Sequence, residues 1–179
     1  MPVRRASAAA APRLVLDMGT GSGCVAVSIA RLCPQARLVA VDLSAKALEV
    51  ARANAHRHQV ADRIDFLAGD AWNALEQGMS FDLIVSNPPY VVPGDPDLWP
   101  EARDFDPPEA LYGGADGLVF YRRLTDGLAE RLRPGGAVMV EVGMGQARPV
   151  AALLSAALPG KRSQFISDGG EVERVVTVT

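Results

Sequence analysis

The sequence predicts an α/β fold of the doubly wound type, built on a mostly parallel sheet. Short apolar runs rich in β-branched residues and bounded by polar residues or glycine are typical of buried parallel strands, and they occur at residues 14–16, 38–41, 83–85 and 137–140. Between them, apolar residues recur at helical spacing, so strands and helices alternate along the chain. Residues 163–167 and 172–178 are expected to close the sheet as an antiparallel pair.

The helical pattern occurs in four stretches, which we expect to form helices: residues 25–32, 47–55, 118–132 and 146–158. Ser44 and Asp116 stand where N-capping side chains are preferred. Pro34 and the sequence Pro134-Gly135-Gly136 are expected to end the helices before them, because proline cannot continue a helix.

Length and composition fit one domain. The chain has 179 residues, and 49% of them are hydrophobic. We expect residues 1–12 to be a tail or linker and residues 13–179 to form the domain. No stretch approaches the roughly 20 apolar residues of a membrane-spanning helix, so a soluble protein is expected. The two cysteines suit a cytoplasmic location, where thiols stay reduced. The net charge of −3 lacks the excess of Lys and Arg that is typical of proteins binding duplex DNA or anionic membranes. Cys24 and Cys33 suit reduced thiols and show no metal-ligand spacing, so no metal site is predicted.

A glycine-rich turn follows the first predicted strand. The sequence Asp17-Met18-Gly19-Thr20-Gly21-Ser22-Gly23 leads directly into a helix, and glycines here let the backbone turn sharply and approach a ligand. Dinucleotide-binding turns have the spacing G-x-G-x-x-G, whereas these glycines alternate behind an acidic residue. The spacing therefore fits a ligand without a pyrophosphate.

Two more carboxylates follow the next two strands. Asp42 closes the second strand, where it is placed to accept hydrogen bonds from both hydroxyls of a ribose, and Asp70 is placed to accept from an adenine amine. Taken singly, each feature is equally well explained as a tight turn or a solvated strand end. Three of them at the carboxyl ends of successive strands, where open α/β sheets bind ligands, favour an adenosyl cofactor.

A proline motif, Asn87-Pro88-Pro89-Tyr90, follows the strand that ends at Ser86. The two prolines fix the backbone and remove two N–H donors, so the carbonyl groups of this turn are acceptors only. The Asn87 side-chain oxygen and the Pro88 carbonyl are placed to accept the two N–H groups of a planar amide or amine, with Tyr90 stacked on it. In isolation such a sequence is a common strand exit, but in a sheet whose first strand carries the glycine turn it predicts a catalytic loop.

The surroundings of this motif are informative too. Residues 87–115 are rich in proline and show no sustained periodicity, and a loop of this length in a compact domain is usually functional. We expect His56 and His58 to be exposed on a polar helix face. If a planar nitrogen held there attacks the sulfonium methyl of an adenosyl cofactor, it becomes more acidic as it acquires the methyl group, so no general base is required before the attack.

These motifs resemble those of the HemK-type glutamine methyltransferases, which methylate the side-chain amide of the glutamine in the Gly-Gly-Gln motif of peptide chain release factors. The resemblance covers roughly residues 13–158 and is carried by residues 17–24, 41–42, 81–90 and 103–118. The last block separates this family from nucleic-acid amino-methyltransferases, which share only the Asn-Pro-Pro-Tyr type of signature.

The resemblance implies a Rossmann-like class I methyltransferase fold, with seven mostly parallel strands and an antiparallel C-terminal strand, and S-adenosylmethionine as cofactor. It implies that residues 19–23 wrap the methionine part of the cofactor and that Asn87 with Pro88 grips the glutamine amide. The candidate catalytic residues are Asn87, Pro88, Pro89 and Tyr90, and the candidate cofactor-binding residues are Asp17, Gly19, Thr20, Gly21, Gly23, Asp42, Asp70, Ala71 and Asn87.

The sequence departs from the family in three places. Residues 160–173 match the family weakly, so no function is carried onto them. The family often has an aromatic residue directly after the acid at the end of strand three, where this chain has Ala71, with Trp72 one place later. Bacterial members usually have an N-terminal helical recognition domain, for which the dozen residues before the first strand are too few. A truncated chain, a stand-alone member and a catalytic subunit with a recognition partner are the alternatives.

Two other functions compete with glutamine methylation. An exocyclic amine of adenine or cytosine in RNA or DNA needs the same pair of acceptors, although the acidic composition argues against it. A non-catalytic subunit that binds S-adenosylmethionine is the second alternative, and the intact Asn87–Tyr90 motif argues against that one.

Overall fold

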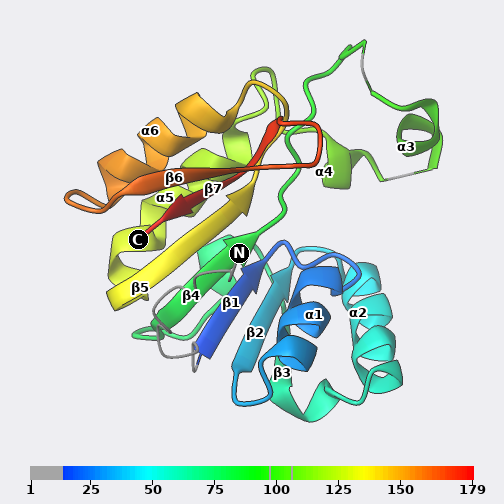
Figure 1. Ribbon diagram of the computed structural model, residues 1–179. Coiled ribbons are helices and arrows are strands. Elements are labelled where there is room, and N and C mark those ends of the chain that lie inside the picture. The colour runs from blue at the N-terminus through cyan, green and yellow to red at the C-terminus, as the bar shows by residue number, and fades with distance from the viewer. Residues whose placement is uncertain (1–13, 97, 106) are drawn as a thin grey trace, which may run out of the picture.

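The computed structural model describes residues 14–96, 98–105 and 107–179 and confirms the predicted α/β architecture (Figure 1). Seven strands form one sheet in the order β3-β2-β1-β4-β5-β7-β6. Neighbouring strands are parallel except where β7 pairs with β5 and β6. The strands are β1 (Leu14–Met18), β2 (Arg37–Asp42), β3 (Ile64–Ala68), β4 (Phe81–Ser86), β5 (Leu132–Glu141), β6 (Ser163–Ser167) and β7 (Glu173–Val178). The tail expected at residues 1–12 lies outside the described residues.

Helices cover both faces of the sheet (Figure 1). The long ones are α1 (Cys24–Leu32), α2 (Ala45–Arg57), α5 (Val119–Arg131) and α6 (Ala147–Ala157). Successive side chains of a strand point to opposite faces, and in β1 Val15 packs with α1 and α2 whereas Leu16 packs with α5 and α6. Two apolar clusters, one on each face, therefore hold the sheet between the helix layers.

The strand order places the predicted functional segments at one edge. Because β3, β2, β1, β4 and β5 are parallel neighbours, their carboxyl ends meet at the same edge of the sheet. The glycine turn leaves β1 there and the Asn87–Tyr90 motif leaves β4 beside it. This edge is the place where the fold can assemble a site from segments far apart in sequence.

Two predictions about local structure are wrong. The proline-rich segment 87–115 contains two short helices, α3 (Pro100–Phe105) and α4 (Pro108–Leu111), in which proline occupies the first helical position that tolerates it. The sequence Pro134-Gly135-Gly136 does not end the preceding helix, which stops at Arg131. It lies inside β5, where a register shift between Phe81 and Leu83 of β4 accommodates it.

Of the two predicted helix caps, Ser44 is confirmed and Asp116 is wrong. Ser44 caps α2, since its hydroxyl accepts a hydrogen bond from the Ala47 N–H at 3.2 Å. Asp116 is not the N-cap of α5, which is Leu118; it accepts the Leu118 N–H at 3.1 Å and pairs with Arg122. His56 and His58 are exposed, as predicted.

Within the described ranges, no helix is both long and apolar enough to span a membrane. The same residues contain no group of three or more His, Cys, Asp or Glu side chains placed to hold a metal ion.

Candidate functional site

The glycine turn after β1 is anchored to β2 by its backbone. The N–H groups of Gly19 and Thr20 both donate to the Val41 carbonyl, at 2.9 and 3.0 Å. Gly21 has a φ of +55°, a conformation that L side chains rarely adopt, and a Cβ added there would meet no atom within 4 Å. The turn is therefore anchored to β2, and Gly21 at its tip borders open space.

Asp17 is the buried acid of this turn. Its Oδ2 accepts hydrogen bonds from the Thr20 hydroxyl at 2.7 Å and from the Ala26 N–H at 3.0 Å. Oδ1 is buried and has no partner among the described residues. Burial raises the pKa of the Asp17 carboxyl from 3.8 to about 6, although both hydrogen bonds act to lower it. A buried acceptor left open in this way fits a donor group supplied by a ligand.

Asp42 lies at the end of β2 and faces the same turn. Its Oδ2 accepts the Gly21 N–H at 2.7 Å and its Oδ1 accepts the Ser44 N–H at 2.8 Å. These two bonds fix the plane of the carboxylate, and each oxygen keeps a second lone pair as an acceptor. A pair of neighbouring hydroxyls, as in a ribose, fits those two positions.

Asp70 and Ala71 follow β3, and α5 holds the turn on which they lie. The Asp70 carboxylate pairs with Arg123, and the Trp72 indole N–H donates to the Arg123 carbonyl at 3.0 Å. Gly127 of α5 lies against the indole, because a Cβ there would come within 2.9 Å of three ring atoms. Trp72 thus has a packing role, and the contacts of Asp70 and Ala71 with adenine stay a prediction.

The Asn87–Tyr90 motif leaves β4 as a turn whose acceptors are open. The Ser86 hydroxyl donates to the Met18 carbonyl at 2.6 Å, which ties the end of β4 to β1. Among the residues that the structure describes, none donates a hydrogen bond to the Asn87 side-chain oxygen or to the Pro88 carbonyl. Asn87 is exposed whereas Pro88 is buried, so the loop is fixed while its two predicted acceptors stay available.

The segment from Leu111 to Leu118 braces this loop. The Val91 N–H donates to the Leu111 carbonyl at 2.8 Å, and the Gly113 N–H donates to the Val91 carbonyl at 2.9 Å. A Cβ on Gly113 would come within 2.7 Å of the Pro89 carbonyl oxygen, so the two backbones approach closely only because this residue is glycine. The segment from Leu111 to Leu118 therefore supports the Asn87–Tyr90 loop.

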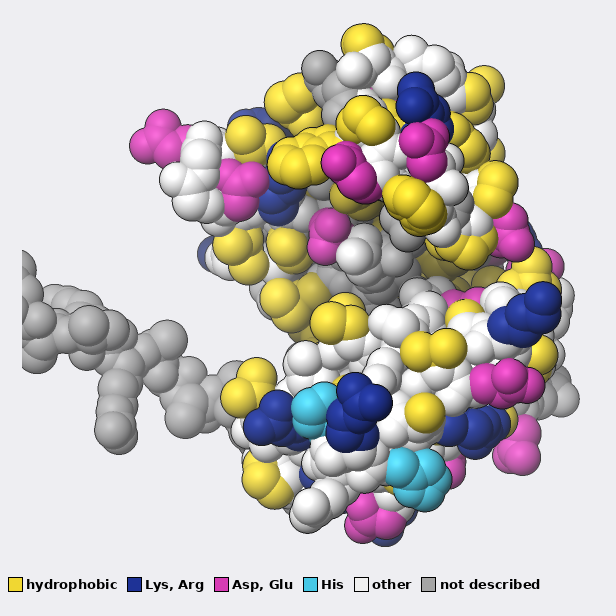
Figure 2. Space-filling model, turned by 90° about the vertical axis from the view of Figure 1, so that its right-hand side faces the viewer, with side chains coloured by type: hydrophobic (Ala, Val, Ile, Leu, Met, Phe, Trp, Pro, Cys, Tyr) yellow, Lys and Arg dark blue, Asp and Glu magenta, His cyan; other side chains and the backbone are white. Residues whose placement is uncertain are grey.

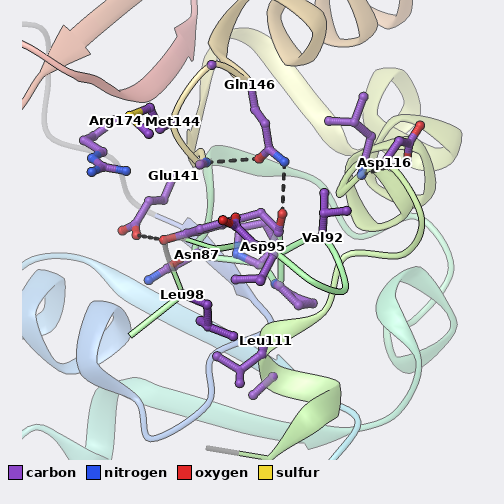
Figure 3. Close-up of a pocket in the computed structure, with 18 of the residues that line it drawn as sticks. Asn87, Val92, Asp95, Leu98, Leu111, Asp116, Glu141, Met144, Gln146 and Arg174 are labelled. Carbon is purple, nitrogen blue, oxygen red and sulfur yellow. Dashed lines mark hydrogen bonds between the residues drawn. The ribbon is translucent and has the colours of Figure 1, made fainter. Parts of the chain in front are cut away.

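The turn between β5 and α6 holds the loop at Tyr90. The Gln146 side chain accepts the Gly143 N–H at 3.1 Å and donates to the Tyr90 carbonyl at 2.9 Å (Figure 3). The Tyr90 hydroxyl donates to Glu141 Oε1 at 3.2 Å. Burial, and then the charge of Glu141, raises the pKa of Tyr90, so this hydroxyl remains a donor at neutral pH.

A cavity of about 1020 Å³ opens on the outer side of this loop. It is lined by all four residues of the Asn87–Tyr90 motif and by side chains from the long 91–118 segment, the end of β5 and the start of β7 (Figure 3). Figure 2 shows this face hollowed between two parts of the molecule, with acidic side chains gathered on the upper one. The glycine turn, Asp42 and Asp70 do not line the cavity, whereas Asn87 lines it and follows β4, the sheet neighbour of the strand that carries the glycine turn. A candidate cofactor side and a candidate acceptor side are thus distinct.

Three residues of the site were not predicted from the sequence: Glu141, Gln146 and Arg174. Glu141 obeys the rule that identified Asp42, because it ends a parallel strand. Arg174 is the second residue of β7, and an antiparallel strand begins at the edge where the parallel ones end. Gln146 carries no sequence signal, since its role depends on a contact with Tyr90, 56 positions away.

The fold is that of a class I methyltransferase domain, and comparison with known proteins agrees. Residues 5–98 match the methyltransferase small domain family, so the chain belongs to that family. Among solved structures, a ribosomal protein L11 methylase from Lactobacillus delbrueckii subsp. bulgaricus superposes with a TM-score of 0.67 at 20% identity, over 95% of this chain and 71% of that one. This likeness shows the shared fold.

The predicted resemblance to the HemK-type enzymes is confirmed. The chain is 46% identical to the release factor glutamine methyltransferase of Geobacter sulfurreducens, over 86% of this chain and 52% of that protein. It is 50% identical to the enzyme of the same name from Bordetella pertussis, over 81% of this chain and 53% of that protein. The chain thus spans about half the length of these curated relatives.

The buried carboxyl of Asp17 predicts a pH dependence of stability. Because its folded pKa of about 6 lies above the unfolded value of 3.8, the stability that it contributes is present below pH 3.8 and lost as pH rises through 6. Asp17→Asn removes this loss, so the variant should gain up to about 3 kcal/mol over the parent between pH 4 and 7, two pKa units at about 1.4 kcal/mol each.

Urea unfolding of the cofactor-free protein at several pH values measures this difference. Asp65→Asn, at an exposed position of β3, is the matched control and should show no such trend. Parallel curves for the parent and Asp17→Asn would show that Asp17 is not held as a costly buried charge.

Proposed function

We propose that this chain is the catalytic part of an S-adenosylmethionine-dependent protein-glutamine N-methyltransferase that acts on the Gly-Gly-Gln motif of peptide chain release factors. One observation carries the proposal most: the Asn87 side-chain oxygen and the Pro88 carbonyl lie beside a large cavity, and none of the described residues donates to either of them. The names of the curated relatives support the substrate.

The residues of the glycine turn fit S-adenosylmethionine. The buried Oδ1 of Asp17, which has no partner among the described residues, suits the cationic amino group of the methionine part, and the open space at Gly21 leaves room for a ligand. Asp42 would hold the two ribose hydroxyls with its remaining lone pairs, while Asp70 and Ala71 would border the adenine. When bound, the cofactor supplies an electrophilic methyl group on its sulfonium.

The catalytic loop would activate a poor nucleophile by holding it. The lone pair of an amide nitrogen is delocalised into its carbonyl, so positive charge builds up on the nitrogen as it attacks. The Asn87 Oδ1 and the Pro88 carbonyl, each accepting one N–H, would orient the amide and stabilise that charge. The proton leaves after methylation, which agrees with the exposed positions of His56 and His58 away from the cavity.

The other two loop residues would shape the pocket. Pro89 keeps the backbone rigid and lacks a donor that would compete for the acceptors. The ring of Tyr90, held at its hydroxyl by Glu141 and at its carbonyl by Gln146, would stack on the planar amide and exclude water.

Recognition of a whole release factor needs a larger surface than this cavity. Stable protein–protein interfaces bury about 800 Å² on each partner, whereas a tripeptide tip contributes a small part of that. We therefore propose that residues 13–179 act as the methyltransferase domain and that a further domain or a partner subunit supplies most of the docking surface. Because the proposed substrate is a release factor, we expect the methylation to take place in the cytoplasm.

The role of Asn87 predicts a selective loss of turnover. Asn87→Ala removes an acceptor that acts mainly once charge develops, so kcat should fall about 100-fold or more, the scale for one preorganised hydrogen-bond partner. The dissociation constant for S-adenosylmethionine, measured by calorimetry, should change much less. Turnover equal to that of the parent would refute the acceptor-pair mechanism.

The choice of acceptor is tested by labelling. The chain is incubated with methyl-labelled S-adenosylmethionine and, separately, with a release factor, the same factor with its Gly-Gly-Gln glutamine changed to alanine, and tRNA. The proposal expects label in the first alone, with a high KM because most of the docking surface is missing. Label in tRNA alone would favour an exocyclic amine acceptor, and cofactor binding without any transfer would favour a non-catalytic subunit.

A further inference from the structure

We infer that Arg174 binds the main chain of the acceptor polypeptide beside the target residue, with its guanidinium donating to a backbone carbonyl oxygen and Glu141 accepting a backbone N–H. This inference rests on the proposed function and specifies that the cavity binds the main chain of the acceptor. Neither residue was a candidate from the sequence, and both line the cavity with Asn87.

Arg174 is built into the cavity wall from β7. The Val142 N–H donates to its carbonyl at 2.9 Å, which ties the start of β7 to the end of β5 beside Glu141. Figure 3 shows the side chains of Arg174 and Glu141 next to each other on one side of the cavity. The charge of Arg174 also reaches Tyr90, where it opposes the rise in the pKa of that phenol.

A carboxylate outside the cavity fixes the guanidinium. Arg174 Nε donates to Asp168 Oδ2 at 2.9 Å, and Asp168 Oδ1 accepts the N–H groups of Gly170 at 2.8 Å and Val172 at 3.2 Å. Asp168 is thereby held by the loop between β6 and β7, and its pKa is lowered, first of all by the hydrogen bond from Arg174. Only Nε is used, and in the described part of the chain no group accepts from the two terminal nitrogens of Arg174.

The charges near Arg174 favour a neutral partner. The guanidinium pairs with the carboxylate of Asp168 and lines the cavity together with Glu141, so two carboxylates offset its positive charge while its donors stay directed. A phosphate would be repelled by both carboxylates, whereas a carbonyl oxygen would not. Glu141 uses Oε1 for the Tyr90 hydroxyl, and Oε2 receives no donor from the described residues. One donor and one acceptor side by side match the C=O and N–H of a peptide backbone.

The test compares two arginines at the same end of the molecule. Arg174→Gln removes the terminal donors, and Arg148→Gln is the matched control, since Arg148 is exposed, pairs with Glu173 and does not line the cavity. Initial rates of methyl transfer are measured against release factor concentration at saturating S-adenosylmethionine. Arg174→Gln should raise KM for the release factor about 10- to 100-fold, the scale of one charge-assisted hydrogen bond, and leave kcat within about threefold.

A role in acceptor binding differs from a merely structural one in two readouts. Arg174→Lys, which keeps a charged donor but loses the planar fork, should recover part of the KM, and the Kd for S-adenosylmethionine should be equal in all variants. Asp168→Asn should raise KM in the same direction, and its effect should shrink in the Arg174→Gln background because both act through one guanidinium.

The failures of the two proposals can be told apart. If the parent chain labels the release factor but Arg174→Gln leaves KM unchanged, or changes it no more than Arg148→Gln does, Arg174 does not bind the acceptor. A loss confined to kcat or to cofactor affinity would equally overturn the inference. If the parent labels no protein at all, the proposed function is wrong and the inference falls with it.

Discussion

The Asn87–Tyr90 loop has two acceptor oxygens, on Asn87 and Pro88, to which none of the described residues donates, so the loop must be held by its other atoms. Three neighbours hold it. Ser86 is tied to β1, Val91 is paired with the segment around Gly113, and the Tyr90 carbonyl takes the amide of Gln146. The Asn87 and Pro88 oxygens take no part in this support, and preorganised acceptors of that kind act without rearrangement during a reaction.

The glycine turn, which we propose as the cofactor side, differs in that it holds a buried carboxylate with only one of its two oxygens hydrogen-bonded. Asp17 has one oxygen paired and one without a partner among the described residues, and burial keeps its pKa near 6. Such a group costs stability in the free protein, and a ligand that donates to it offsets the cost. The two sides meet at Asn87, because β1 and β4 are neighbours in the sheet and their exits lie at the same edge.

Local patterns predicted ranges for every strand except β3, together with the main helices and the motifs at the carboxyl ends of β1, β2 and β4, because those features depend on neighbouring residues. The short helices α3 and α4 and the course of β5 through Pro134-Gly135-Gly136 were missed, since tertiary contacts there outweigh local preference. Gln146 and Arg174 enter the site only through partners distant in sequence or through the antiparallel course of β7. No period or spacing encodes such contacts.

Locating the transferred methyl group by tandem mass spectrometry tests the account most directly. A release factor treated with this chain and S-adenosylmethionine carrying a trideuterated methyl group is digested, and the peptide with the Gly-Gly-Gln motif is fragmented. The account predicts one labelled methyl group on that glutamine, and on its side-chain amide. Label on another residue of the factor, or none in a factor that the full-length relatives do methylate, would contradict it.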